Sequence, residues 1–249
     1  MKKVILSLAA ACAMTTAFAQ NQATLNQTGN SQQATISQAG QNQALVTQLN
    51  GAGSGSNKLT SNQTGRSNYL QSTQSGTTNE ASFKQHLDGY SSAYSTQTGT
   101  SNKITSEQAS NSGTSAYASF TQNGMRNQAT LSQVDNVNGY GGTSAYFNQQ
   151  GNDNEASIKQ GDANIGDANF ASITQQGNSN KARLEQLGDR HSANFTQVGN
   201  SNVIKGLGGD VALQSGSLNN LTIFQNSNSN VASVGQNGTG NMGNIQQGN

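Results

Sequence analysis

Apolar residues in this chain recur two positions apart inside a short word that is repeated along its length. The word can be written N-x-A-x-φ-x-Q-x-G, where φ is apolar, and clear copies are NEASFKQ at 79–85, NQATLSQ at 127–133 and NEASIKQ at 154–160. Period two indicates a β-strand, because successive side chains of a strand point to opposite faces. The recurrent Asn, Ala, φ and Gln therefore share one inward face, and the variable polar positions between them face solvent.

The glutamine that ends each word recurs mostly every eleven residues. The aligned glutamines are Gln27, Gln38, Gln48, Gln63, Gln74, Gln85, Gln97, Gln108, Gln122, Gln133, Gln149, Gln160, Gln175, Gln186, Gln197, Gln225, Gln236 and Gln247, with Gly208 in one further, degenerate slot. About nineteen words thus fill the chain from residue 20 onward. Longer steps follow mostly even-numbered words, which predicts that insertions gather on one edge.

Short connections such as TGNS at 28–31 and QGNSN at 176–180 separate the words. Gly and Asn tolerate the positive φ of a tight reversal. The chain contains no proline, so every strand keeps its backbone donors.

Strand and tight turn, repeated without helices, predict an all-β solenoid of about nineteen short strands. Two words would form one rung, giving two facing sheets with an amyloid-like, thin core. Inward Asn and Gln would be costly to bury alone, but stacked on identical residues they can satisfy one another as amide ladders. Repetition makes such a polar interior workable.

Composition alone would favour a disordered or prion-like chain, because apolar residues make up 31% and aromatic residues 5% of the 249 residues. Residues 1–19 read as a secretory signal peptide: Lys2 and Lys3 precede an apolar stretch that ends in Ala17-Phe18-Ala19. Residues 20–249 form the expected repeat domain. An alternative, lipoprotein interpretation would acylate Cys12.

Cleavage before Gln20 would remove the single cysteine, and with it any disulfide. Loss of Lys2 and Lys3 would leave 10 basic against 11 acidic residues, a net charge of −1. Such a chain has little charge repulsion to oppose self-association. No later stretch is apolar enough for a membrane span.

No constellation of residues favours catalysis, a cofactor, a metal or nucleic-acid binding. His86 and His191 lie in different words, without a ligand cluster, and are expected at the surface. Asp162 and Asp167 lack the glycine pattern of a calcium turn, and GLGGD at 206–210 lacks the Lys-Ser/Thr end of a phosphate loop. No nucleophile has a base and an orienting partner, so an enzyme is not expected.

Oppositely charged residues four apart occupy outward positions of several words, as in Glu80 with Lys84 and Lys181 with Glu185. Solvated surface charge, contributing under about 1 kcal/mol per pair, is the favoured interpretation. A role in setting the register between rungs, or in resisting lateral clumping, is the alternative.

The spacing Q-x4-N-x5-Q recurs along the chain, in five copies with A-x-φ between Asn and Gln, for example as Gln74-Asn79-Gln85 and Gln149-Asn154-Gln160. It closely resembles the curlin repeat of the curli subunits that form bacterial functional amyloid. The resemblance implies a structural subunit that polymerises outside the cell into β-rich fibres for biofilm matrix and surface adhesion. It also implies self-association as a homopolymer, a companion curlin subunit and export through a curli-type outer-membrane channel.

In that family the inward Asn and Gln ladders carry assembly. Carried over to this sequence, the ladder residues are Gln27, Gln63, Asn68, Gln74, Asn79, Gln85, Gln97, Asn102, Gln108, Gln122, Asn127, Gln133, Gln149, Asn154, Gln160, Gln175, Asn180, Gln186, Gln197, Gln225, Asn230, Gln236, Asn241 and Gln247. The chain departs from the family in having no Gly-rich targeting segment between residue 19 and the first word.

Two other functions stay open at this point. One is the nucleator of the same fibre, which the degenerate word at 202–208 would fit. The other is a monomeric β-solenoid that binds a surface such as ice or a glycan, although the regular outward Thr-x-Thr grid of an ice binder is absent.

Overall fold

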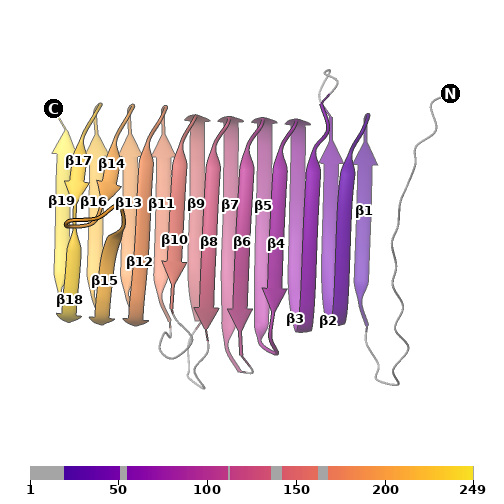
Figure 1. Ribbon diagram of the computed structural model, residues 1–249, viewed down its shortest axis with the longest axis horizontal. Helices are drawn as coiled ribbons and strands as arrows, with labels where there is room; N and C mark the ends of the chain where they lie inside the picture. Colours follow the sequence, from indigo (N-terminus) through magenta and orange to yellow (C-terminus); the bar gives the residue numbers. More distant parts are fainter. Residues whose placement is uncertain (1–19, 51–54, 112, 136–141, 162–167, 249) are drawn as a thin grey trace.

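A computed structural model describes residues 20–50, 55–111, 113–135, 142–161 and 168–248, and these residues form a single β-solenoid (Figure 1). They contain nineteen strands and no helix, so the described chain has no helix that could span a membrane. The strands are β1 (Gln22–Thr28), β2 (Gln33–Leu49), β3 (Lys58–Thr77), β4 (Glu80–His86), β5 (Tyr90–Thr100), β6 (Lys103–Ser110), β7 (Ser115–Met125), β8 (Gln128–Asp135), β9 (Gly142–Asn152), β10 (Glu155–Gln160), β11 (Phe170–Gln176), β12 (Lys181–Asp189), β13 (Ser192–Val198), β14 (Val203–Lys205), β15 (Ala212–Ser217), β16 (Asn220–Asn226), β17 (Val231–Ser233), β18 (Gly235–Thr239) and β19 (Met242–Gly248).

The strands pair in two series, and every pairing between named strands is parallel. The first series runs β1, residues 42–49 of β2, residues 69–77 of β3, then β5, β7, β9, β11, β13, β16 and β19. The second series runs residues 33–41 of β2, residues 58–66 of β3, then β4, β6, β8, β10, β12, β14 with β15, and β17 with β18. The long strands β2 and β3 belong to both series and bend between them. The expected all-β solenoid, with two words to a turn, is confirmed.

The register keeps each word in phase with the words above and below it. In β8, β10 and β12, for example, Ala129, Ala156 and Ala182 are paired in succession. The chain returns to the same register after 21 residues between β1 and β2 and after 28 between β13 and β16. Extra residues therefore lie between the paired segments, and the pairing of the words is preserved.

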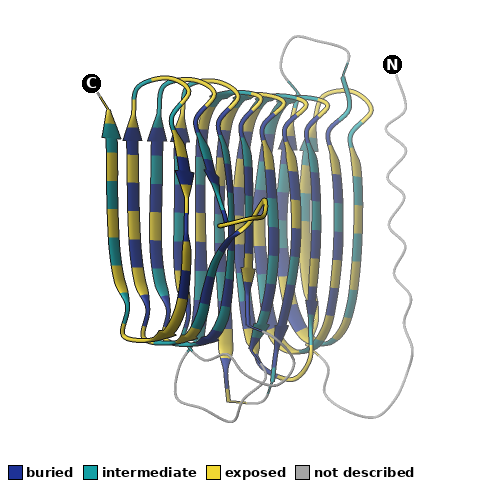
Figure 2. Ribbon diagram, turned by 60° about the vertical axis from the view of Figure 1, so that its left-hand side comes forward, coloured by how far each residue is buried: buried dark blue, intermediate teal, exposed yellow. Residues whose placement is uncertain are grey.

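The inward face buries the Ala and φ positions as one hydrophobic cluster, and Figure 2 shows the alternation of buried and exposed residues along each strand. Side chains from both series meet in it: Phe83 of β4 contacts Phe120 of β7 with ring centroids 6.1 Å apart. Burial of apolar surface contributes about 25 cal/mol per Å². Because Ala fills one of the two apolar positions of most words, this core is thin.

The degenerate word is where the sequence-based alignment is wrong. Gly208 does not fill the glutamine slot; it lies in an insertion, residues 206–211, that leaves the solenoid in the middle of a strand position. β14 pairs with β12 before the insertion, and β15 rejoins the same strand after it, so that Gln214 is opposite Gln186. Counting at constant spacing missed this, because an insertion inside a word looks like a degenerate word.

The strand ends that lead into the turns require glycine for two independent reasons. Gly124 has φ +122°, and a Cβ added there would lie 2.0 Å from the carbonyl oxygen of Gly151 in the next turn. The same close approach recurs from Gly76 to Gly99 and from Gly151 to Gly177. A stack of glycines therefore lets the turns follow the spacing of the strands.

We expect Gly124→Ala to lower the free energy of unfolding by about 2 kcal/mol, because it adds both backbone strain and a clash with the neighbouring turn. Gly209→Ala is the matched control, since a Cβ at that position meets nothing within 4 Å. Urea unfolding of the soluble protein, followed by circular dichroism, measures both changes. Equal midpoints for the two variants would contradict the stacked-turn interpretation.

Candidate functional site: stacked amide ladders

The inward glutamines form two continuous hydrogen-bonded ladders along the axis of the solenoid. In each, the Nε2 of one glutamine donates to the Oε1 of the next, at 2.7 to 3.0 Å. The ladder of the first series contains Gln27, Gln48, Gln74, Gln97, Gln122, Gln149, Gln175, Gln197, Gln225 and Gln247. The ladder of the second series contains Gln38, Gln63, Gln85, Gln108, Gln133, Gln160, Gln186, Gln214 and Gln236.

Every ladder glutamine except Gln27 also bonds to a strand of the other series. The Nε2 of Gln97 in β5, besides its ladder bond, donates to the carbonyl oxygen of Glu80 in β4 at 3.1 Å. Gln133 in β8 donates in the same way to Tyr117 in β7. These amides are fully buried. Because burying an unpaired amide is expensive, the two bonds from each Nε2 are what makes a glutamine acceptable in the core.

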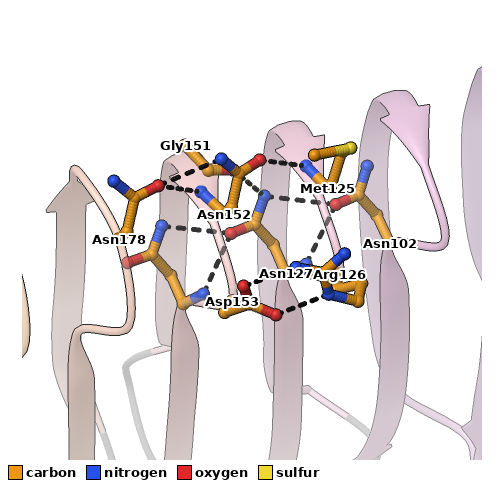
Figure 3. Close-up of polar contacts among 9 residues, drawn as sticks. Asn102, Met125, Arg126, Asn127, Gly151, Asn152, Asp153 and Asn178 are labelled. Atoms are coloured by element: carbon orange, nitrogen blue, oxygen red, sulfur yellow. Dashed lines mark hydrogen bonds and ion pairs between the residues drawn. The ribbon is translucent and has the colours of Figure 1, made fainter.

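Asparagines form a third ladder, which is continuous through the second series. The Oδ1 of each asparagine accepts the backbone N–H of the next, as from Asn102 to Asn79 at 3.1 Å and from Asn127 to Asn102 at 3.0 Å. The members are Asn57, Asn79, Asn102, Asn127, Asn154, Asn180, Asn202 and Asn230. The Nδ2 of Asn127 also donates to the carbonyl of Gly151 at 2.7 Å, which fixes the turn above it (Figure 3).

The first series carries the same asparagine ladder only near its ends. Asn21, Asn42 and Asn68 are linked at one end, and Asn219 and Asn241 at the other. Between them the equivalent position holds Ser91, Ala116 and Thr143, all buried. The structure thus brings the predicted Gln residues together in full, whereas Asn68 and Asn241 belong to short segments.

His191 lies in this first-series ladder, so its expected surface position is wrong. The side chain is 1% exposed. Its backbone N–H donates to Oδ1 of Asn169 at 2.9 Å, and its Nδ1 faces the backbone N–H of Asn219 at 3.3 Å. The imidazole stands in for an asparagine amide, because Nδ1 supplies the same acceptor. His86 is half-buried and lies 3.2 Å from Glu107.

Several ladder members escaped the sequence analysis. Gln214 was hidden by the insertion before it, and with it Asn219, which follows Gln214 at the regular spacing. Asn57, Asn169 and Asn202 lie in words that lack one of the two glutamines of that spacing. A further, exposed asparagine ladder runs through the turns, from Asn152 to Asn178 and on to Asn200, and Figure 3 shows the step from Asn152 to Asn178. The repeated G-N-x-N of these turns was a signal for it.

Charged side chains pair between rungs. Lys84 lies 2.7 Å from Glu107 on the next rung of the second series, and Arg183 lies 2.6 Å from Glu155. The hydrogen bond from Lys84 lowers the pKa of Glu107. Burial raises the pKa of Glu155, but the hydrogen bond and charge of Arg183 outweigh it, so that the pKa is lowered overall. These ion pairs connect words that are stacked on each other in the second series, and solvent screens them.

The two series present different outer faces. The described strands of the first series contain no Asp, Glu, Lys or Arg, whereas the second series carries Lys58, Glu80 and the pairs just described. On the first series, Tyr69, Tyr94, Tyr117, Tyr146 and Phe170 form a zigzag of rings, with centroids 5.4 to 5.6 Å apart. We call these the charged face and the aromatic face.

Both ends of the described solenoid are open. β1 pairs only with β2 and β19 only with β16, and neither has a fully buried residue. Gln247 is the last donor of one ladder, and Gln27, at the other end, offers an acceptor that no earlier described glutamine fills. Unpaired strand edges recruit further strands unless they are blocked. The described residues contain no group of three or more potential metal ligands.

A comparison with curated proteins finds no match. Residues 166–199 match the family model of the curlin associated repeat. That segment contains β11, β12 and β13, with Gln175, Gln186 and Gln197 in the two ladders. The match and the β-solenoid that carries it are together consistent with a curlin-repeat family.

Proposed function

We propose that this protein is the structural subunit of a secreted, extracellular curli-type amyloid fibre and that its chains add end to end. The observation that carries the proposal is the state of the two ends, where both glutamine ladders and both strand series stop without a cap among the described residues. A second chain can continue the same hydrogen bonds that hold one turn on the next. The curlin-repeat match supports this role.

In this proposal the two series act as two facing sheets of an amyloid-like core, and every Asn and Gln of the ladders contributes either to the fold or to the junction. The mid-chain members hold neighbouring turns together. The members nearest the ends, among them Gln27 and Gln247, are half-exposed and ready to pair. The function is structural and needs no cofactor.

Secretion would follow from the signal peptide expected at residues 1–19, which lie outside the described residues. The fibre would reside on the bacterial cell surface and serve biofilm matrix and adhesion, with a companion curlin subunit and a curli-type outer-membrane channel as partners. These features come from the resemblance. Asp162 and Asp167 also lie outside the described residues.

The chain of residues 20–249 is expected to convert into β-rich, thioflavin-positive fibres after a lag, because a new fibre end must form before ladders can extend. Preformed seeds should abolish the lag. Thioflavin fluorescence and electron microscopy measure both effects. A folded protein that stays monomeric at high concentration, with or without seeds, would contradict the proposal and favour the surface-binding solenoid.

Gln247→Ala is expected to slow elongation from seeds about fivefold, because it removes one ladder bond of about 1 kcal/mol at the docking end. Its effect on folding should be small, since Gln247 is not buried. Gln122→Ala is the matched control, because Gln122 is fully buried and bonded to Gln97 and Gln149.

The control should instead lower the free energy of unfolding by about 1–3 kcal/mol, through the buried partner that it leaves unpaired. Seeded elongation and urea unfolding are measured on both variants. Equal slowing of elongation by both variants, at equal stability, would argue against growth through the ends.

A further inference from the structure

The described solenoid has an odd number of strand positions. β14 and β15 together occupy one position, split by the insertion at 206–211, and β17 and β18 occupy the position stacked on it. The first series then has ten positions and the second series has nine. β1 and β19, the first and last strands, both belong to the first series.

An odd count decides where the next strand must lie. Along the chain, positions alternate between the series, and the strands of the two series run in opposite directions (Figure 1). The position after β19 therefore belongs to the second series, above β17 and β18. The next chain, however, begins with β1, which is a first-series strand within its own chain.

We propose, building on the fibre function above, that successive chains of residues 20–249 are related by a half-turn about the fibre axis. A half-turn exchanges the sides of the two series and also reverses strand direction across the axis. β1 of the incoming chain then occupies the second-series position and still runs parallel to β17 and β18. Residues 33–41 of the incoming chain, the first half of its β2, then occupy the position above β19. The path of the solenoid continues as if the two chains were one.

The side chains at this junction match position by position. Extending the in-phase register places Asn21 on Asn230, Ala23 on Ala232, Leu25 on Val234 and Gln27 on Gln236 on one side. On the other side it places Gln32 on Asn241, Ala34 on Gly243, Ile36 on Ile245 and Gln38 on Gln247. These pairs extend the registers seen inside the chain.

Hydrogen-bond polarity also matches. Within the chain each Gln Nε2 donates toward the C-terminal end, as from Gln214 to Gln236. The C-terminal end therefore presents the donors of Gln236 and Gln247, and the N-terminal end presents the acceptors of Gln27 and Gln38. The junction joins one donor to one acceptor in each of the two ladders.

Stacking without the half-turn leaves a gap. If β1 of the next chain were placed on β19, the nearest second-series strand would be residues 33–41 of β2, two positions above β17 and β18. One strand position would be empty, and the ladder would be interrupted beside Gln236. The half-turn removes this gap, because no position is left unfilled in either series.

Electrostatics does not oppose the rotation. Residues 20–57 and 211–249 contain no Asp, Glu, Lys or Arg, so all charged side chains beyond the expected signal peptide lie between Lys58 and Asp210. The junction joins two uncharged ends in either orientation. The strand count alone therefore decides between them.

The half-turn has a visible consequence for the fibre surface. One chain spans nine and a half rungs, or about 45 Å at about 4.8 Å per rung. Each flank of the fibre would present the charged face of one chain and the aromatic face of the next, in alternation. Without the half-turn, one flank would be aromatic and the other charged along its whole length.

The test is to label one outward position and find the label on successive chains. Residues 20–249 contain no cysteine, and Thr121 lies exposed on β7. Fibres of the Thr121→Cys chain are reacted with a maleimide gold cluster and viewed by electron microscopy. We expect successive labels on opposite flanks, about 45 Å apart along the axis.

Two truncations test the effect of parity, because one makes the number of positions even and the other keeps it odd. Residues 20–239 lack β19 and have eighteen positions, and residues 20–226 lack β17, β18 and β19 and have seventeen. We expect labels on the same flank for the eighteen-position chain and on opposite flanks for the seventeen-position chain. If a truncated chain does not fold, the helical symmetry of unlabelled full-length fibres decides, with a rotation near 180° expected between successive chains.

The outcomes separate the two proposals. Seedable fibres whose full-length chains carry every label on one flank, or a rotation near zero, would overturn the half-turn and leave the fibre function standing. A chain of residues 20–249 that forms no fibres would overturn the fibre function and the half-turn with it.

Discussion

The structure depends on the side-chain amide of the inward glutamine. One N–H of Gln97 is bonded along the ladder to Gln122, and a bond from the same nitrogen crosses to the backbone of β4. For a buried amide without such partners, the free-energy cost of desolvation would exceed the stabilisation from its packing. The glutamine is therefore tolerated only where a second glutamine lies directly above it and a strand of the other series lies opposite. That single requirement fixes both the spacing of the rungs and the distance between the series.

The other regularities follow from it. If glutamines must stack, the alanine and φ positions must stack as well, because they share the inward face of the same strand. The turns must then repeat at the same spacing. This brings Gly124 so close to the backbone of Gly151 that a Cβ at position 124 would clash with it. The paired charged residues occupy outward positions, where Lys84 reaches Glu107 on the next rung. The in-phase register is thus a consequence of the polar interior, and the small apolar core follows it.

Sequence predicted the features that depend on the local word, and failed where a position's role depends on its neighbours in the stack. Period two and the recurrent glutamine were sufficient for the strands, the inward face and both glutamine ladders. Gln214 was missed because an insertion within a strand position preserves the stack and breaks the spacing. His191 was misplaced because its role as an acceptor appears only when Asn169 and Asn219 lie below and above it. The ion pairs were expected along a strand, but strands one rung apart are close enough for charges at equivalent positions to meet.

The same stacking argument connects the fold to assembly. Every interior rung is already a junction between two nearly identical surfaces, so the contacts that hold β13 on β11 are of the same kind as those an incoming chain would make on β19. Such a chain needs no separate docking surface. Its two ends need only be uncapped, and their inward residues need only match in register. Lateral contacts differ, because the outer faces carry side chains that the stack leaves free to vary. Chains with the same ladders can therefore differ in the residues of their charged and aromatic faces, and so in the surfaces that they contact. The residues at their ends must stay the same for the ladders to continue.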